Sequence, residues 1–504
     1  MAPLRLDDTI AAIATPLGEG AIGMVRLSGP QALAIAESLF RPSRPRRRRG
    51  GWASHRLYHG HIVDPLTGRA VDEVLLAYMR GPRTYTRQDV VEITGHGSVA
   101  GMREILRLTV AAGARPAERG EMTLRAFLSG RLDLAQAEAV LDAVRARTPR
   151  ALSLATQQLG GGLSRAVSAV RQELVAILAH LEATIDFAED DVPPPAPGLL
   201  LQRLDQAAGR LERLLATARA GRLHREGLRV AIVGRPNVGK SSLLNAMLQE
   251  ERAIVTAIPG TTRDVIEEAV DVAGLPLVLV DTAGITETDD PVERIGVARS
   301  REAMRQADLI LLVLDVSRPL DEADRAIASL VAEVLPAART APVPRPASRV
   351  LSPATRDSDR GTRDSAPRES SVLVVWNKVD LAPAPARHTS APLLPGVPEV
   401  RVSALTGEGL DSLRQRLHRA ALGQDGVQAM AGAETIVSST RHRDALERAA
   451  LALAEARRAV ERGLAADFVC IDLREAVVAL GTITGESVTE DLLTSIFSQF
   501  CIGK

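Results

Sequence analysis

Hydrophobic and polar residues alternate in short runs through the first quarter of the chain. Thr9–Ala14 and Ala21–Leu27 predict two strands around a turn that contains glycine, and Pro30–Phe40 predicts a short helix with proline in its first turn. A hairpin at 61–71 and apolar runs at 74–79 and 90–95 complete the pattern. We therefore expect an N-terminal α+β domain over residues 1–130.

From Arg131 the spacing of apolar residues lengthens to that of a helix. One face is marked by Leu132, Leu134, Ala135, Ala139, Val140 and Val144, and the spacing continues to Leu181. Prolines at 193–197 end this array, a helix is predicted at 199–225, and helices return at 439–463 and 468–480. We predict a helical domain split into 131–226 and 424–504, with a different domain, 227–423, inserted into it.

The inserted section begins with a short apolar run, Leu228–Val233, which predicts a strand buried on both faces. The sequence Gly234-Arg-Pro-Asn-Val-Gly-Lys-Ser241 follows and fits the phosphate-loop pattern. Glycines let the backbone N–H groups and the helix N-terminus point at phosphate oxygens, while Lys240 adds a positive charge and the Ser241 hydroxyl can hold Mg²⁺.

Four weaker motifs follow in order. They are the switch segment Ile254–Asp264 with Thr261 and Thr262, the strand end Asp281-Thr-Ala-Gly284, the strand end Asn377-Lys-Val-Asp380, and Ser403-Ala-Leu405. The threonine hydroxyls would complete the Mg²⁺ shell, and Asp281 would lie in the second shell of the metal. The Asp380 carboxylate would accept two hydrogens from guanine, which adenine cannot supply. Five motifs in this order predict a Ras-like GTP-binding domain.

The domain has the Ras-like motifs but differs from Ras-like enzymes at the residue after Gly284. Those enzymes place a water-orienting Gln at that position. Ile285 is apolar, so the attacking water must be oriented by another group. Asn237 could help hold a monovalent cation against the phosphates, and Glu293 could orient the water. A solvated carboxylate that caps the helix beginning near Pro291 explains Glu293 equally well.

Lysine and asparagine are rare in a chain with 62 Lys+Arg residues. Lysine occurs at 240, 378 and 504, and asparagine at 237, 245 and 377. An arginine-biased chain should keep lysine where a compact ammonium is needed. Lys504 is therefore a candidate functional residue, with a solvated chain end as the alternative.

The composition bounds the partners and the compartment. Formal net charge is zero, so any contact with RNA must be local. Two cysteines, 470 and 501, and the lack of any apolar segment of membrane-spanning length predict a reduced, cytoplasmic protein with no membrane partner. The basic segment 41–51 and His96 are more simply explained as loops, and 336–370 as a disordered insertion.

Several further stretches carry a family resemblance. They are Thr9-Ile-Ala-Ala-Ile-Ala-Thr-Pro, Gly95-His-Gly, the run from Arg125 to Ala139 that ends in RLDLAQAEA, the five nucleotide motifs, Glu293-Arg-Ile-Gly, and the ending Ile496-Phe-Ser-Gln-Phe-Cys-Ile-Gly-Lys. With them the sequence resembles the MnmE (also called TrmE) family of bacterial and organellar tRNA modification GTPases over essentially its full length.

The resemblance implies a homodimer whose N-terminal domain resembles folate-binding domains and takes 5-formyltetrahydrofolate. Together with an FAD-dependent partner, MnmG (GidA), it would form a heterotetramer that adds a carboxymethylaminomethyl group to carbon 5 of the wobble uridine of certain tRNAs. Its GTPase domains would pair across K⁺, in place of an arginine finger.

Carried over residue by residue, the resemblance assigns the following sites. Nucleotide contacts fall to Asn237, Val238, Gly239, Lys240, Ser241, Ser242, Thr256, Ala257, Ile258, Pro259, Gly260, Thr261, Thr262, Asp281, Thr282, Ala283, Gly284, Asn377, Lys378, Val379, Asp380, Ser403, Ala404 and Leu405. K⁺ falls to Asn237, Thr256, Ile258 and Thr261, Mg²⁺ to Ser241 and Thr262, and catalysis to Glu293. Folate contacts fall to Arg26, Glu92, Arg131 and Lys504, with Arg131 where other members carry Lys.

Two questions stay open at this point. Cys501 matches the family's terminal cysteine and could be reactive, or it could be a buried, inert thiol. The alternative function is a ribosome-assembly GTPase, an RNA-binding switch without one-carbon chemistry. Such a protein should end in a basic RNA-binding domain, and 424–504 shows no dense basic patch.

Overall fold

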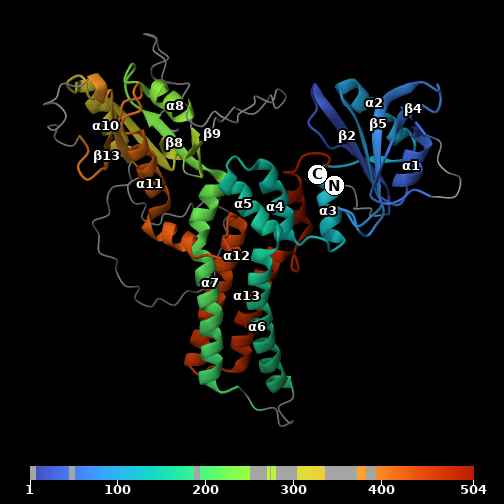
Figure 1. The fold of residues 1–504 in the computed structure, drawn as a ribbon. Coiled ribbons are helices and arrows are strands. Elements are labelled where there is room, and N and C mark those ends of the chain that lie inside the picture. The colour runs from blue at the N-terminus through green and yellow to red at the C-terminus, as the bar shows by residue number, and fades with distance from the viewer. Residues whose placement is uncertain are drawn as a thin grey trace, which may run out of the picture.

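The computed structural model describes residues 7–44, 51–186, 193, 195–249, 269–272, 274–279, 304–334, 372–381 and 393–504. These residues form two sheet-containing lobes on either side of a long helical bundle (Figure 1). The fold is thus multidomain, with mixed α/β and all-α parts. Within the described residues, no helix combines the length and the apolar character needed to cross a membrane.

The N-terminal domain is a seven-stranded sheet in the order β3-β4-β5-β6-β2-β1-β7. The strands are β1 (Ile10–Ile13), β2 (Gly20–Ser28), β3 (Phe40–Pro42), β4 (Arg56–Val63), β5 (Ala70–Met79), β6 (Val90–Gly97) and β7 (Arg115–Pro116). Helices α1 (Ala32–Leu39) and α2 (Val99–Ala111) share one core with residues from the inward face of the sheet, such as Val25, Leu27 and Ile93. The strands expected at 9–14, 21–27 and 90–95 are confirmed.

The predicted helix at Pro30–Phe40 is shorter than expected. It begins at Ala32, so Pro30 lies before the helix and not in its first turn. Gly29 has φ +140°, and the Gln31 N–H donates to Thr9 Oγ1 at 2.9 Å. This turn holds the chain against β1 and delays the start of the helix.

A short helical segment leads from this domain into the bundle. Helix α3 spans Glu121–Leu128, α4 Leu134–Arg145 and α5 Pro149–Leu159. The Asp133 side chain accepts from the Gln136 N–H, and the Gln136 side chain accepts from the Asp133 N–H, which is a capping box. Thr148 caps α5 and is followed by Pro149 at the first helical position.

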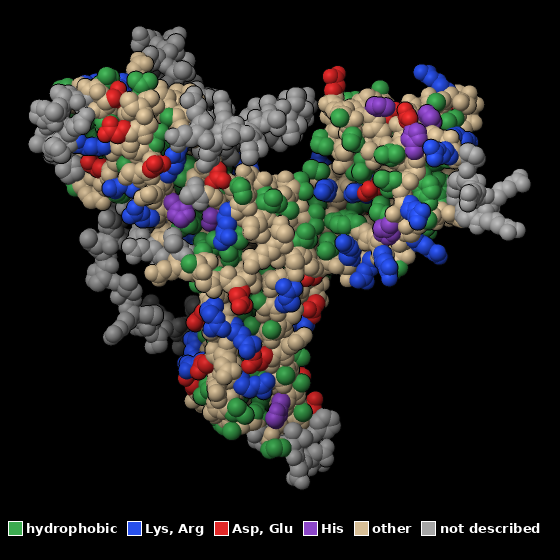
Figure 2. Space-filling view, viewed as in Figure 1, with side chains coloured by type: hydrophobic (Ala, Val, Ile, Leu, Met, Phe, Trp, Pro, Cys, Tyr) green, Lys and Arg blue, Asp and Glu red, His purple; other side chains and the backbone are tan. Residues whose placement is uncertain are grey.

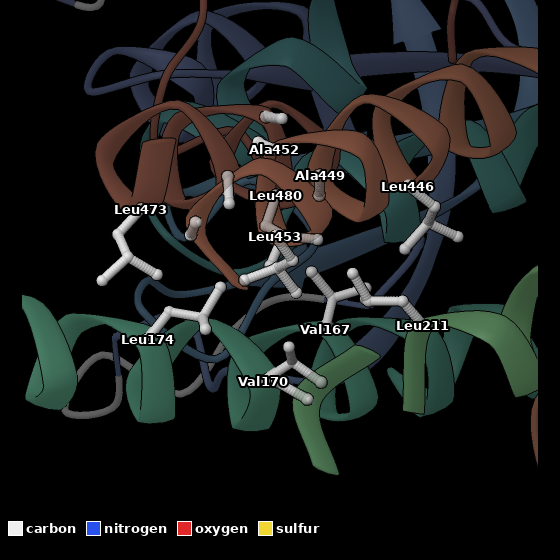
Figure 3. Close-up of a cluster of buried hydrophobic side chains, with 14 of the residues drawn as sticks. Val167, Val170, Leu174, Leu211, Leu446, Ala449, Ala452, Leu453, Leu473 and Leu480 are labelled. Atoms are coloured by element: carbon white, nitrogen blue, oxygen red, sulfur yellow. The ribbon is translucent and has the colours of Figure 1, made fainter. Parts of the chain in front are cut away.

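The helical bundle contains α6 (Gly162–Asp186), α7 (Pro197–Glu226), α12 (Thr440–Glu461) and α13 (Ala466–Thr484). Its core places large aliphatic side chains of α6 and α7 against alanines and leucines of α12 and α13, as Figure 3 shows for Val167, Leu211 and Leu453. Full burial of one such leucine stabilises the fold by about 1.5–3 kcal/mol. Helix α14 (Glu490–Phe497) packs against α3 and α4 through Ile496 and Phe497.

The second sheet, in the α/β domain, has the order β13-β12-β11-β8-β10-β9. Its strands are β8 (Leu228–Val233), β9 (Ala269–Val272), β10 (Leu275–Leu279), β11 (Leu309–Asp315), β12 (Val372–Asn377) and β13 (Glu399–Arg401), and only β9 runs antiparallel to its neighbour. Helices α8 (Lys240–Gln249), α10 (Glu322–Val334) and α11 (Leu410–Ala431) belong to the same domain. Alternate residues of β8 enter two different cores, which confirms that this strand is buried on both faces.

The chain enters and leaves the α/β domain through the bundle. Helix α7 leads into β8 across Gly227, which has φ +89°. Helix α11 breaks at Gly423, where φ is 67° and ψ is 171°, before the chain returns to α12. The last residues then return to the N-terminal domain, where Ile502 forms a β-bridge with Arg119.

Candidate functional site

The loop between β8 and α8 is the first part of the candidate site. Lys240 Nζ donates to the carbonyls of Gly234 at 2.8 Å and Arg235 at 2.7 Å, so the loop curls around its own ammonium group. Gly234 has φ +153°, and an added Cβ there would lie 2.3 Å from the Val313 carbonyl oxygen. The side chains of Asn237, Ser241 and Ser242 are exposed at the start of the helix. This arrangement presents N–H groups, a cation and hydroxyls to an anionic ligand.

Asn377, at the end of β12, connects this loop to the next segment of the site. Its side chain is buried, donates from Nδ2 to the Val238 carbonyl at 2.9 Å, and accepts at Oδ1 from the Ala404 N–H at 3.0 Å. Gly239 has φ +93°, and a Cβ at this position would lie 2.2 Å from Asn377 Nδ2. Asn377 thus holds segments at 238–239 and 404 in a fixed relation.

Lys378 makes a second bridge to the phosphate loop. Its Nζ donates to the Asn237 carbonyl and to Asp315 Oδ2, both at 2.7 Å. Burial by itself would raise the pKa of Asp315, but hydrogen bonds from Lys378 and Ser317 reverse this effect and lower it. The carboxylate therefore stays ionised and keeps the lysine beside the loop.

Asp380 and Ser403 form the third part of the site. The Ser403 hydroxyl donates to Asp380 Oδ1 at 2.5 Å and accepts from the Thr406 N–H at 3.1 Å. Ser403 is fully buried, whereas Leu405 is 85% exposed. The structure therefore brings together three of the predicted segments, 237–242, 377–380 and 403–405, at the carboxyl ends of β8 and β12.

The remaining nucleotide and metal residues lie outside the described part of the chain. These are Thr256, Ala257, Ile258, Pro259, Gly260, Thr261, Thr262, Asp281, Thr282, Ala283, Gly284 and Glu293. The predicted insertion at 336–370 lies outside it as well.

A second cluster of predicted residues lies on the N-terminal domain. Strands β2 and β6 pair Arg26 with Glu92, and their side chains form an ion pair with Nη2–Oε1 at 2.7 Å and Nε–Oε1 at 2.9 Å. Arg26 Nη1 also donates to the Gly503 carbonyl at 3.4 Å, which brings the residue before Lys504 to this pair. Gly503 has φ +91°, and a Cβ there would lie 2.6 Å from the Ile13 carbonyl oxygen.

Tyr85 joins Arg131 to the same cluster. The Arg131 guanidinium lies 5.3 Å from the centre of the Tyr85 ring, and the Tyr85 hydroxyl is 2.9 Å from Thr123 Oγ1. Burial raises the pKa of Tyr85, and the positive charges of Arg131 and Arg26 oppose this rise. Sequence reasoning missed Tyr85, because a single tyrosine between threonines gives no motif.

One expectation about a single residue needs correction, and one open question about another is narrowed. His96 lies in β6 and not in a loop, and its Nδ1 is 2.7 Å from Asp72 Oδ1. This hydrogen bond to Asp72 raises the pKa of His96, so the Asp partner that the sequence did not reveal is present. Cys501 is exposed, which rules out the buried thiol, whereas Cys470 is buried. The basic segment 41–51 lies partly outside the described residues.

Known protein families match this chain on both sides of residues 132–133. Residues 9–131 match the family model of the GTP-binding protein TrmE N-terminus, and residues 134–501 match that of the MnmE helical domain. The chain is 47% identical over 502 residues to the tRNA modification GTPase MnmE of Heliobacterium modesticaldum, covering 99% of this chain and 100% of that protein. It is 45% identical over 498 residues to the protein of the same name from Geobacillus kaustophilus, covering 99% of each.

This chain belongs to the MnmE family of tRNA modification GTPases. Its enzyme class is accordingly that of a GTP hydrolase in tRNA modification. Among solved structures, Era in complex with MgGDPNP and 16S ribosomal RNA nucleotides is 26% identical, with a TM-score of 0.25 over 38% of this chain and 56% of that chain. The G domain of the T. maritima FeoB iron transporter is 24% identical, with a TM-score of 0.23 over 38% of this chain and 98% of that chain. At these TM-scores the likenesses add nothing to the family assignment.

Proposed function

We propose that this protein hydrolyses GTP in the cytoplasm and, with the FAD-dependent enzyme MnmG (GidA), adds a carboxymethylaminomethyl group to carbon 5 of the wobble uridine of certain tRNAs. The one-carbon unit comes from 5-formyltetrahydrofolate. The observation that supports this most strongly is that one chain holds two separate polar clusters. One surrounds the phosphate loop, and the other lies on the N-terminal domain beside the C-terminal residues.

GTP fits the first cluster. The Lys240 ammonium group donates hydrogen bonds to two loop carbonyls. Phosphate oxygens are stronger acceptors, so a phosphate bound in this loop would attract the same ammonium group. The Asp380 carboxylate binds the guanine N1 and N2 hydrogens, while Ala404 and Leu405 supply N–H groups to the guanine carbonyl. The domains proposed for this activity are 227–423 for the nucleotide and 131–226 with 424–504 for the helical domain that carries it.

Mg²⁺ and K⁺ belong to this reaction as well. Ser241 with Thr262 holds Mg²⁺, which neutralises charge between the phosphates during hydrolysis. Asn237, Thr256, Ile258 and Thr261 hold K⁺ where GTPase domains of a homodimer pair, and Glu293 orients the attacking water. Asn237 fits this role because its exposed side chain is free to turn to a ligand while Lys378 fixes its backbone carbonyl.

The cation dependence of hydrolysis tests this part of the proposal. The steady-state GTPase rate of the purified protein is measured in K⁺ and in Na⁺ at equal ionic strength. We expect a rate many-fold higher in K⁺, because Na⁺ is too small for the same set of oxygen ligands. Equal rates in the two salts would remove the K⁺ site and the pairing that depends on it.

Folate fits the second cluster by its charges. Arg26 and Glu92 are each 22% exposed, so their ion pair can exchange with a ligand that carries both a hydrogen-bond donor and an acceptor. Arg131 is exposed over the flat ring of Tyr85, and Lys504 follows Gly503 at the edge of the cluster. The cations Arg131 and Lys504 suit the carboxylates of the folate tail.

Deletion of Lys504 tests the folate assignment. We expect weaker binding of 5-formyltetrahydrofolate in a calorimetric titration, with GTP hydrolysis largely retained, because the deletion removes a cation only from the second cluster. Arg462→Gln removes an exposed cation elsewhere and serves as the control. An unchanged folate titration after the deletion would return Lys504 to a simple chain end.

The ribosome-assembly alternative is less well supported. The relatives that match 99% of this chain are named tRNA modification GTPases, and the family models cover both the N-terminal and the helical parts. A GTPase of the alternative class has no use for the cluster at Arg26, Glu92 and Tyr85.

A further inference from the structure

A large cleft separates the helical part of the molecule from the α/β domain. It has a volume of about 1120 Å³. Its walls come from α4, α5, the end of α7, the start of α12 and α14 on one side, and from β8, β10 and residues 305–308 on the other. Among the residues that the structure describes, none of the predicted nucleotide or folate residues lies in its lining. The cleft is therefore distinct from the described parts of both candidate sites.

The lining of the cleft carries an excess of positive charge. Eight arginines line it against five acidic residues, although the whole chain has no net charge. On the face shown in Figure 2, basic and acidic side chains are interspersed over the helical bundle, as the zero net charge leads one to expect. A concave surface of one sign focuses the electrostatic potential more strongly than a convex one.

The acidic residues on the helical side are already occupied by neighbours. Glu138 binds Arg441, with Oε1–Nε at 2.8 Å, and also His442, with Oε2–Nε2 at 2.6 Å. Asp142 accepts from Arg225 at 2.8 Å. These groups pair with one another, so they do not cancel the charge of the remaining arginines in the cleft.

Two arginines of the α/β wall have no such partner among the described residues. Arg229 and Arg305 are exposed, and neither has a side-chain ion pair or hydrogen bond within the part of the chain that the structure describes. On the opposite wall, Arg145 Nη2 donates to the Gln499 carbonyl at 2.8 Å. The guanidinium group has further N–H donors that can bind a ligand. Positive groups thus stand on both walls of the cleft.

The other polar groups in the lining are of the kind that binds phosphate. Hydroxyls of Ser439, Thr440 and Ser495 lie among the arginines, whereas the Ser438 hydroxyl donates to Gln158 Oε1 at 3.2 Å. Phosphate oxygens in nucleic-acid complexes are contacted mainly by Arg, Lys, Ser and Thr side chains and by backbone N–H groups. An acidic protein surface would be matched by the charge but would leave these small hydroxyls without a particular role.

We propose that this cleft binds the sugar–phosphate backbone of the tRNA substrate. The proposal rests on the proposed function, since it takes tRNA as the substrate. Because the walls belong to different domains, one bound strand contacts the α/β domain and the helical bundle together.

The double variant R229Q/R305Q tests the proposal. Its affinity for a fluorescently labelled tRNA transcript is measured by anisotropy at several KCl concentrations, with the full-length protein. The loss of two phosphate contacts should lower the slope of log affinity against log salt by about 1.4, at roughly 0.7 per phosphate for single-stranded RNA, and weaken binding about tenfold or more. The matched control R103Q/R448Q removes two exposed arginines outside the cleft and should keep the wild-type slope and affinity.

Each outcome decides a different claim. If the wild-type protein binds tRNA and both double variants bind it equally well, the cleft is not the RNA site, while the proposed function stands. If the wild-type protein binds no tRNA, with or without the FAD-dependent partner, both proposals are wrong. If R229Q/R305Q keeps its tRNA affinity but loses binding to the partner enzyme, the cleft is a protein-docking surface and the RNA proposal is overturned. Thermal unfolding midpoints equal to that of the wild type show that the variants are folded.

Discussion

The contact between Gly239 and Asn377 gives a prediction whose size can be worked out from the structure. In Gly239→Ala, the new Cβ would lie 2.2 Å from Asn377 Nδ2, which is far too close, and the residue would also have to keep φ near +93°. The left-handed backbone costs an L-residue about 1–2 kcal/mol. Displacement of the buried Asn377 amide breaks its hydrogen bond to the Val238 carbonyl, which lowers the unfolding free energy by about 1–3 kcal/mol more.

Gly396→Ala separates the two contributions. Gly396 has φ +80°, and a Cβ there would have no heavy atom within 4 Å. This variant should lose about 1–2 kcal/mol of unfolding free energy through backbone strain alone, whereas Gly239→Ala should lose about 2–5 kcal/mol. Urea denaturation followed by circular dichroism measures both values.

Nucleotide titration completes this test. Gly239→Ala should also lose most of its affinity for GTP, since Asn377 holds the loop at Val238 and the Ala404 N–H together. Gly396→Ala should bind GTP like the wild type. Equal destabilisation by both substitutions, or full GTP affinity in Gly239→Ala, would refute the argument that Asn377 locks the phosphate loop to the guanine-binding segments.

Three further predictions concern other charged groups. Asp380→Asn should change the nucleotide preference from guanine to xanthine in a competition titration, and tight GTP binding by this variant would disprove the base contact. Glu138→Gln should destabilise the protein by about 3–5 kcal/mol in denaturation experiments, because it leaves the Arg441 charge without its buried partner. Burial lowers the pKa of His224, whose Nδ1 is 2.9 Å from the Gly274 carbonyl. The folded state therefore binds a proton at His224 less readily than the unfolded chain does. The unfolding free energy should keep its full value above the usual histidine pKa of about 6.5 and fall as the pH drops below it. The variant His224→Gln should show a smaller fall.

The periodicity of the sequence was enough to predict the main elements of the fold. Leu228–Val233 was expected as a strand and is one, because a continuous apolar run suits a strand covered on both faces. The helices at 197–226 and 440–461 match the predicted spans closely, since leucine and alanine recur at helical spacing over many turns.

Contacts between distant segments could not be predicted in the same way. Arg26 meets the Gly503 carbonyl across 477 positions of sequence, and Arg131 meets Tyr85 through the packing of a loop against the end of α3. Neither contact follows from local spacing. The pairing of His96 with Asp72 likewise depends on β5 and β6 lying side by side in the sheet, which the pattern of a single strand does not specify.

The transfer of labelled carbon from folate to tRNA is the most direct test of the central claim. The protein, the FAD-dependent partner, tRNA and GTP are incubated with 5-formyltetrahydrofolate that carries ¹³C in the formyl group, and the wobble nucleoside is analysed by mass spectrometry. We expect a modified uridine that carries the label and that is not formed when GTP is replaced by a non-hydrolysable analogue. An unlabelled modified uridine, or a labelled one formed equally well without GTP hydrolysis, would contradict the claim that the two clusters serve one reaction.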